Sequence, residues 1–156
     1  MNGKRSIISM LIILIVVCLL SVLYINNRNK QLDSEKLFIQ RVNKIDYVKV
    51  QKWSTFRTLN LDEITRLKRI ILNNYEQKKY KVEYYNSSIF PVVFHVRIYD
   101  EKLIIGYSHK SRELYFYKYW FVSKDEKDIY KAKIQGLLLK VDDEIYKLLQ
   151  DIGIKL

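Results

Sequence analysis

The sequence predicts an α+β protein, with an N-terminal transmembrane helix followed by a small domain of a mostly antiparallel sheet and two helices packed on one face. Three observations predict it. The run Ile7–Ile25 contains no charged residue, no Gly and no Pro. A short strand pattern then precedes an amphipathic helical pattern. Several strand-like segments joined by short turns follow, before a last amphipathic helix, and this order is typical of helices on one face of an antiparallel sheet.

The apolar run is long enough to cross a bilayer. As a helix, its 19 residues would rise about 28 Å, close to the ~30 Å thickness of the hydrocarbon layer. Fourteen of the 19 are Ile, Leu or Val, which favours insertion by roughly 4 to 8 kcal/mol. We therefore predict a transmembrane anchor over 7–25, preceded by a short basic tail over 1–6.

The apolar run differs from a removable signal. A cleavable signal has a shorter apolar core that ends in small residues of the Ala-x-Ala kind. This run has no Ala, and apolar residues continue beyond Ser21. Cys18 follows Val17, where a lipoprotein signal needs a small residue. We therefore expect an uncleaved signal anchor whose partner is the lipid bilayer.

The orientation of the anchor depends on the charges that flank it. Lys4 and Arg5 precede it, whereas Arg28, Lys30 and Lys36 follow it, so the positive charges alone do not place the N-terminus inside. The charged N-terminal tail is very short, and a first apolar segment usually behaves as a signal anchor. We expect a single-pass protein of the cell membrane with its N-terminus inside and its C-terminal domain extracytoplasmic.

Beyond the anchor we expect a polar stalk over 26–43 and an α+β domain over 44–156. The only Cys lies in the anchor, so the domain depends on an apolar core rather than on disulfides. The chain carries a net charge of +11. Without Lys4 and Arg5, 26 basic and 17 acidic residues remain, which is a net charge of +9. Such a basic surface indicates an anionic binding partner: lipid headgroups, cell-wall polymers, an acidic protein or nucleic acid. An extracytoplasmic location disfavours nucleic acid.

The domain opens with a strand pattern over Ile45–Trp53, followed by the clearest helix. Asn60 and Glu63 have the spacing of a capping box, and Leu59 is placed to pack on Ile64 as a hydrophobic staple. Apolar residues then recur at helical spacing and predict a stripe that faces the core. The stripe consists of Leu61, Ile64, Leu67, Ile70, Ile71 and Tyr75.

A series of strands follows. The expected strands are Lys81–Tyr85, Val92–Tyr99, Leu103–Ser108, Leu114–Val122 and Ile129–Ile134, with a last strand through 137–139. Val92–Tyr99 is apolar at its even positions and more polar at its odd positions, which is typical of a half-buried strand. Leu114–Val122 is apolar on both faces, which predicts a central position in the sheet.

A short helix ends the chain. Asp142, Asp143 and Glu144 are expected in its first turn, where negative charge suits the helix dipole. Gly153 is placed as its C-terminal stop. The apolar face of this helix consists of Ile145, Leu148, Leu149 and Ile152.

Motifs of enzymatic chemistry do not occur in the sequence. It has no Gly-rich phosphate loop, no Gly-x-Ser-x-Gly elbow and no His-Glu-x-x-His. His95 and His109 would face each other if their strands pair across the turn at 100–102. We nonetheless favour an ordinary outer-face histidine over a metal pair, because no carboxylate or Cys is ready to complete a site. We expect no enzymatic activity, cofactor, metal or small-molecule substrate.

Aromatic residues beside basic ones form the candidate site. Tyr115, Tyr117 and Tyr119 alternate along one strand pattern, and His95 and Arg97 are expected near them in the sheet. Such a set can anchor a protein partner or stack on bases and sugars. A Tyr-rich sheet packed under a helix is the simpler interpretation of the same pattern. These five residues are the predicted interaction surface.

After the apolar anchor, the sequence carries the segments KIDYVKV, NLDEITRLKRIIL and DDEIYKLLQDIG, with Tyr-rich strands between them. This layout, over most of 44–153, resembles a group of small uncharacterised membrane-anchored or lipid-anchored domains of low-GC Gram-positive bacteria. Many members have a lipidated Cys, and this chain lacks the matching motif. The resemblance implies an extracytoplasmic location and no particular activity.

These observations favour a non-enzymatic interaction module that binds a protein partner or an anionic envelope component through a basic, Tyr-containing surface. The alternative is an accessory structural subunit of a larger membrane complex that uses Ile7–Ile25 for assembly. A hydrolase with an unrecognised site is a third hypothesis.

Overall fold

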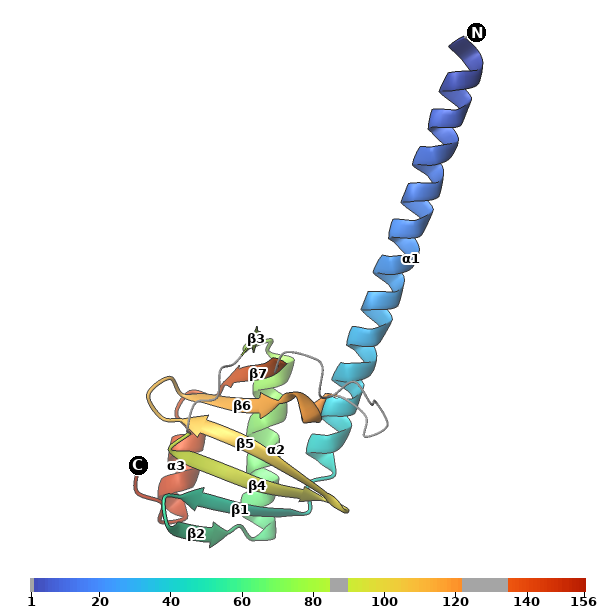
Figure 1. Cartoon of the computed structure of the whole chain (residues 1–156). Coiled ribbons are helices and arrows are strands. Elements are labelled where there is room, and N and C mark those ends of the chain that lie inside the picture. The colour runs from blue at the N-terminus through green and yellow to red at the C-terminus, as the bar shows by residue number, and fades with distance from the viewer. Residues whose placement is uncertain (1, 85–89, 122–134) are drawn as a thin grey trace. The chain divides into compact units, whose positions relative to one another are not determined.

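A computed structural model describes residues 2–84, 90–121 and 135–156 (Figure 1). The chain divides into two compact units, Met1–Lys36 and Leu37–Leu156. Helix α1 (Asn2–Asn43) contributes residues to both units. The second unit holds all the strands described below and is called the domain.

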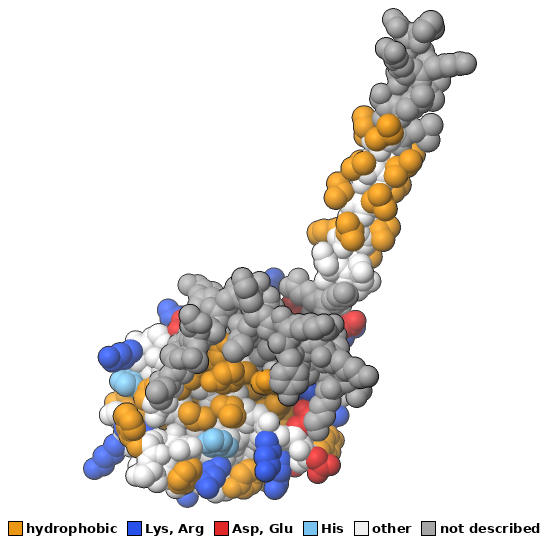
Figure 2. Space-filling view, viewed as in Figure 1, with side chains coloured by type: hydrophobic (Ala, Val, Ile, Leu, Met, Phe, Trp, Pro, Cys, Tyr) orange, Lys and Arg blue, Asp and Glu red, His pale blue; other side chains and the backbone are white. Residues whose placement is uncertain are grey.

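Helix α1 carries the predicted anchor. In the part of the chain that the structure describes, it is the one helix long and apolar enough to cross a membrane, and it lies near the N-terminus. The described apolar side chains between Met10 and Ile25 are exposed, and Figure 2 shows hydrophobic side chains along this part of the helix. Val16, the least exposed of the large apolar side chains described between Met10 and Ile25, is still 47% exposed. Among the described residues, none of the most apolar window of this helix is buried, which is compatible with a helix that crosses a bilayer.

The domain is built on one sheet. Its seven described strands lie in the order β2-β1-β4-β5-β6-β7-β3, and neighbouring strands pair antiparallel throughout. The strands are β1 (Tyr47–Lys52), β2 (Thr55–Thr58), β3 (Tyr80–Tyr84), β4 (Val92–Ile98), β5 (Glu101–Ser108), β6 (Glu113–Tyr117) and β7 (Gln135–Lys140). β3 precedes β4 in the chain but pairs with β7, at the edge of the sheet opposite β2. A long crossover therefore connects β3 to β4.

Helices α2 (Leu61–Glu76) and α3 (Glu144–Asp151) lie on one face of the sheet (Figure 1). The core lies between them and the strands. Along β4 the even residues are buried and the odd ones are more open, as the alternation predicts. The buried Phe94 pairs with Ile105 of β5 and Val50 of β1, and both partners are fully buried. The α+β prediction, with two helices on one face, is confirmed.

The domain begins earlier than the sequence indicates. We expect a boundary at 44 with a polar stalk before it, but the compact unit starts at Leu37. Phe38 and Val42 of α1 are fully buried. The Phe38 ring lies 5.1 Å from Phe116 and 4.9 Å from Phe121, measured between ring centroids. The last turns of α1 therefore belong to the core, because two apolar residues one helical turn apart suffice to pack a helix end.

The predicted capping box of α2 is present. The Glu63 amide donates to Asn60 Oδ1 (2.9 Å), and the Asn60 amide donates to Glu63 Oε2 (2.7 Å). Leu59 and Ile64 are both buried, as a staple requires. Leu61 was wrongly placed in the apolar stripe: it is exposed, because α2 meets the core only from Ile64 onward.

Two strand predictions need correction. The sequence predicts one strand to Trp53, but the chain turns there, with Trp53 at φ 53°, and returns as β2. The strand expected over 114–122 ends at Tyr117 and continues as the short helix η1 (Lys118–Trp120). Trp120 causes this change, because its side chain is fully buried and its Nε1 donates to the Ile104 carbonyl (3.0 Å).

The remaining predictions fall as follows. β6 lies inside the sheet, between β5 and β7, as predicted for an apolar strand. The strand expected through 137–139 is β7. α3 begins at Glu144 and is followed by Gly153 at φ 79°, the left-handed conformation expected of its stop. The strand expected over 129–134 lies outside the described residues.

Candidate functional site

The candidate site lies on the face of the sheet opposite α2 and α3. On this face the cationic group of Lys49 lies 4.2 Å from the ring centroid of Phe56. The guanidinium of Arg97 lies 4.8 Å from the ring centroid of Tyr47. His95 lies beside them on β4. We call these five residues, Tyr47, Lys49, Phe56, His95 and Arg97, the cation–aromatic patch.

Strand register brings the patch together. β1 pairs with β4 so that Tyr47 is opposite Arg97 and Lys49 is opposite His95. Directly paired residues in antiparallel strands point to the same face of the sheet. On the other side of β1, Phe56 of β2 is opposite Gln51, which places its ring diagonally beside Lys49. Three strands therefore supply the patch, and Figure 2 shows basic side chains next to a histidine and hydrophobic side chains on this face.

Hydrogen bonds orient His95. The Gln51 amide nitrogen donates to the Trp53 carbonyl (3.1 Å), which leaves the Gln51 amide oxygen pointing at the imidazole. His95 Nε2 lies 2.7 Å from that oxygen. Because an amide oxygen only accepts, Nε2 carries the proton. This network links the patch to the hairpin between β1 and β2.

The patch is positively charged and partly open to solvent: Phe56 and Arg97 are exposed, and its other three residues are half-buried. Arg97 Nε lies 3.7 Å from Asp46, but both side chains are about half exposed, so this ion pair adds at most about 1 kcal/mol. Lys102 of β5 is opposite Arg97 and is also exposed. Three cations on adjacent strands thus face one flanking carboxylate. Each exposed cation–ring contact is worth about 0.5 to 1 kcal/mol, enough to hold the cation in place without removing it from water.

Two of the three predicted tyrosines, Tyr115 and Tyr117, form a separate cluster with Phe90. Tyr115 and Tyr117 are on the same face as the patch, since Tyr115 pairs with Gly106, which pairs with Val93. Tyr115 is fully buried: its ring stacks on Phe90 at 5.4 Å and meets Tyr117 edge-on at 4.7 Å. Tyr115 is therefore an interior residue of the cluster.

Glycines make room for these rings. A Cβ on Gly136 would collide with the Tyr115 ring, and a Cβ on Gly106 would collide with the Phe90 ring. The missing side chains let the aromatic rings lie directly on the strand backbone, so the cluster covers its part of the sheet as a structural layer.

Of the five predicted site residues, the structure brings His95 and Arg97 into the patch. Tyr119 lies in η1 rather than on the strand, and it is exposed. The pairing of His95 with His109 is wrong, because His95 is opposite Ile104 while His109 lies in the turn after β5. The register explains this. β4 and β5 pair outward from the turn at 99–100, so His95 meets the middle of β5, whereas His109 follows the other end of β5.

Sequence reasoning missed Tyr47, Lys49 and Phe56. Tyr47 and Lys49 alternate on β1 in the same way as Arg97 and His95 alternate on β4, and this parallel was the available signal. No signal in the sequence pointed to Phe56, since its strand is four residues long and all four residues are exposed.

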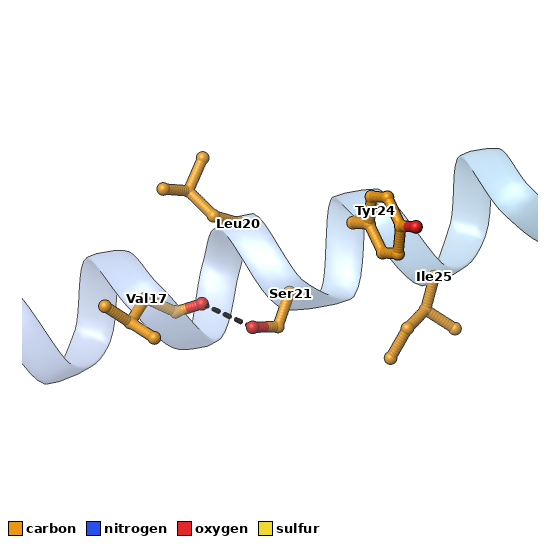
Figure 3. A pocket seen from close by; sticks show the side chains of 5 residues that line it. All are labelled: Val17, Leu20, Ser21, Tyr24 and Ile25. Carbon is orange, nitrogen blue, oxygen red and sulfur yellow. Dashed lines mark hydrogen bonds between the residues drawn. The ribbon is translucent and has the colours of Figure 1, made fainter.

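A small hollow on α1 is a different feature. Val17, Leu20, Ser21, Tyr24 and Ile25 line it, and Figure 3 shows them on successive turns of the helix. The Ser21 hydroxyl donates to the Val17 carbonyl (2.8 Å), so this hydroxyl is satisfied within the helix itself. The hollow is a gap between side chains on the anchor and offers no group for chemistry.

Displaced pKa values occur away from the patch. Burial raises the pKa of Tyr107, with Arg112 opposing the effect. Burial lowers the pKa of Lys68 on α2, and Asp46 partly offsets this. Among the residues described here, no group of three or more His, Cys, Asp or Glu side chains is arranged to hold a metal ion.

No known protein-family model matches the chain, and no curated protein or solved structure does. The resemblance to anchored Gram-positive domains stays a prediction.

Proposed function

We propose that the chain is a single-pass protein of the cell membrane whose α+β domain is a non-enzymatic, extracytoplasmic interaction module. Its cation–aromatic patch would bind an anionic partner, either an acidic protein or an anionic component of the cell envelope. The observation that carries this proposal is the pairing of Lys49 with Phe56 and of Arg97 with Tyr47 on the face opposite α2 and α3.

The patch suits an anionic ligand for a physical reason. Its cations are presented on paired strands, so the sheet sets the spacing of their backbone positions. The ring contacts of Lys49 and Arg97 restrict these two side chains before binding, which lowers the entropy cost of binding. The neighbouring rings add apolar contact around each charge, which is the combination found at the centres of protein interfaces. The net charge of +9 that remains without Lys4 and Arg5 further steers anions toward the domain.

A binding experiment tests the ligand class. The full chain, reconstituted in zwitterionic nanodiscs, would be titrated with polyglutamate and with polyphosphate. We expect the double variant Lys49→Gln/Arg97→Gln to bind at least one polyanion about fivefold to tenfold more weakly than the unmodified chain. The control, Arg69→Gln/Lys147→Gln, removes the same charge from exposed positions on α2 and α3. Equal losses in both variants would mean diffuse attraction and would remove the patch from the proposal.

A labelling experiment tests the orientation. Ser111 is exposed in the turn between β5 and β6, so Ser111→Cys in a Cys18→Ser background offers one reactive thiol. We expect a membrane-impermeant maleimide to label this thiol in intact cells. Labelling that requires lysis would place the domain in the cytoplasm and overturn the extracytoplasmic part of the proposal.

The accessory-subunit alternative has its own test. Purification of the full chain in mild detergent, compared with a chain whose Ile7–Ile25 is replaced by an unrelated membrane helix, separates the two ideas. Stoichiometric partners that depend on the native helix would favour the alternative. Partners that depend on Lys49 and Arg97 favour the interaction module.

A further inference from the structure

We infer that the cation–aromatic patch and the neighbouring β1–β2 hairpin bind anionic lipid headgroups of the membrane that anchors the chain. This inference rests on the proposed function and names its ligand.

Exposed aromatic residues give the first argument. Trp53, at the tip of the β1–β2 hairpin, is 75% exposed, and Phe56 of β2 is 50% exposed. Large aromatic rings are costly to leave in water, and Trp in particular is enriched at membrane–water interfaces, where its apolar body and polar N–H are both satisfied. The hairpin therefore presents the residue type that the headgroup region accommodates best.

The charges beside these rings give the second argument. Lys49 contacts the Phe56 ring, and Arg97 and Lys102 continue the positive charge across β4 and β5. A Lys or Arg near an anionic leaflet contributes roughly fivefold to partitioning, so three together contribute about a hundredfold. An extended set of separate cations on a sheet matches a surface of many mobile phosphates.

The covalent link gives the third argument. Residues 26–36 join the apolar run to the domain. These eleven residues are part of helix α1, along which they rise about 17 Å, and even fully extended they would span no more than about 39 Å. A tethered domain meets the bilayer at a high effective concentration, so contacts too weak for a free protein suffice to hold it there. An acidic protein partner has no such advantage.

The two tryptophans supply the readout. The chain has only Trp53 and Trp120, and Trp120 is fully buried. The full chain would be placed in nanodiscs whose lipids carry a headgroup spin label that quenches Trp emission at short range. The discs would be either zwitterionic or contain about 30% anionic phospholipid. Subtracting the signal of Trp53→Phe, which retains Trp120, isolates the emission of Trp53.

We expect quenching of Trp53 to be at least twofold greater in anionic discs and to fall at about 0.5 M salt, where the Debye length is near 4 Å. The variant Lys49→Gln/Arg97→Gln/Lys102→Gln should lose this difference. A control matched in charge and composition, Arg69→Gln/Lys110→Gln/Lys147→Gln, changes exposed residues outside the patch and should keep it.

Each other outcome decides against the inference. Equal quenching in both kinds of disc would overturn it, and so would equal losses in the patch variant and its control. If quenching is equal while polyanions still bind in a patch-dependent way, lipid is the wrong ligand and the interaction module stands. If polyanion binding is also absent, both proposals fail together.

Discussion

The guanidinium of Arg41, near the end of α1, lies 3.1 Å from the carboxylate of Glu101 at the start of β5, and the two side chains are only 9% and 24% exposed. Arg41 also donates to the backbone carbonyl of Tyr119 in η1. One buried cation thus joins the first helix to two segments that lie far away in the sequence. A charge can be buried only when such partners replace its water.

Loss of the carboxylate should therefore destabilise the domain. In Glu101→Gln the buried Arg41 keeps its charge without its acidic partner. We expect a loss of about 2 to 3 kcal/mol, below the 3 to 5 kcal/mol of a fully buried pair because Glu101 is partly exposed. Guanidinium unfolding of the full chain in nanodiscs, followed by Trp fluorescence, measures it. Asp46→Asn removes the acid of the half-exposed Arg97 pair and should change stability by less than about 1 kcal/mol; similar losses in both would contradict the account.

Gly136 should not tolerate a side chain. In Gly136→Ala the new Cβ would collide with the Tyr115 ring, and because that ring is fully buried we expect a cost of about 1 to 3 kcal/mol. Urea unfolding measures this cost in the native background and in Tyr115→Leu. The cost should be smaller with the shorter side chain. An equal cost in both backgrounds would show that the ring does not exclude the Cβ.

The capping box of α2 should be worth about 1 kcal/mol. Asn60→Ala leaves the Glu63 amide without its acceptor, so thermal unfolding should occur at a lower temperature. Asn73→Ala, at an exposed position on the same helix, is the control. It should be neutral or slightly stabilising, because Ala is the better helix former. A larger loss for Asn73→Ala would remove the cap from the explanation.

Tyr107 should make the domain sensitive to high pH. Its hydroxyl is buried and has no hydrogen-bond partner among the described residues, and burial raises its pKa above the ordinary 10.0. The unfolded chain can ionise this phenol above about pH 10, whereas the folded state keeps it neutral, so stability falls as pH rises through that range.

Tyr107→Phe removes this contribution. We expect a shallower loss of stability above about pH 10 and, at neutral pH, stability equal to or higher than that of the unmodified chain, because no hydrogen bond is lost. Unfolding measured from neutral to alkaline pH checks both expectations. A marked loss at neutral pH would indicate that the hydroxyl has a bonding partner after all.

Features carried by neighbouring residues were predicted well from the sequence. The helix apolar enough to cross a membrane, the Asn60–Glu63 capping box and the alternation along β4 each depend on composition or on spacings of two to four residues. The predictions of element boundaries were wrong where a side chain packs against residues that are far away in the sequence. Trp120 ends β6 by inserting into the core, and Phe38 and Val42 draw the end of α1 into the domain.

The sequence by itself determined that the chain carries an apolar helix able to span a membrane, followed by a basic α+β domain with helices on one face. The tertiary structure alone decided which residues meet. Register places Tyr47 opposite Arg97 and Lys49 opposite His95. Packing against Phe90 and Tyr117 removes Tyr115 from the surface. The physical reason is that a strand pattern specifies which face a residue occupies, while the choice of partner strand and its register depends on packing the whole core.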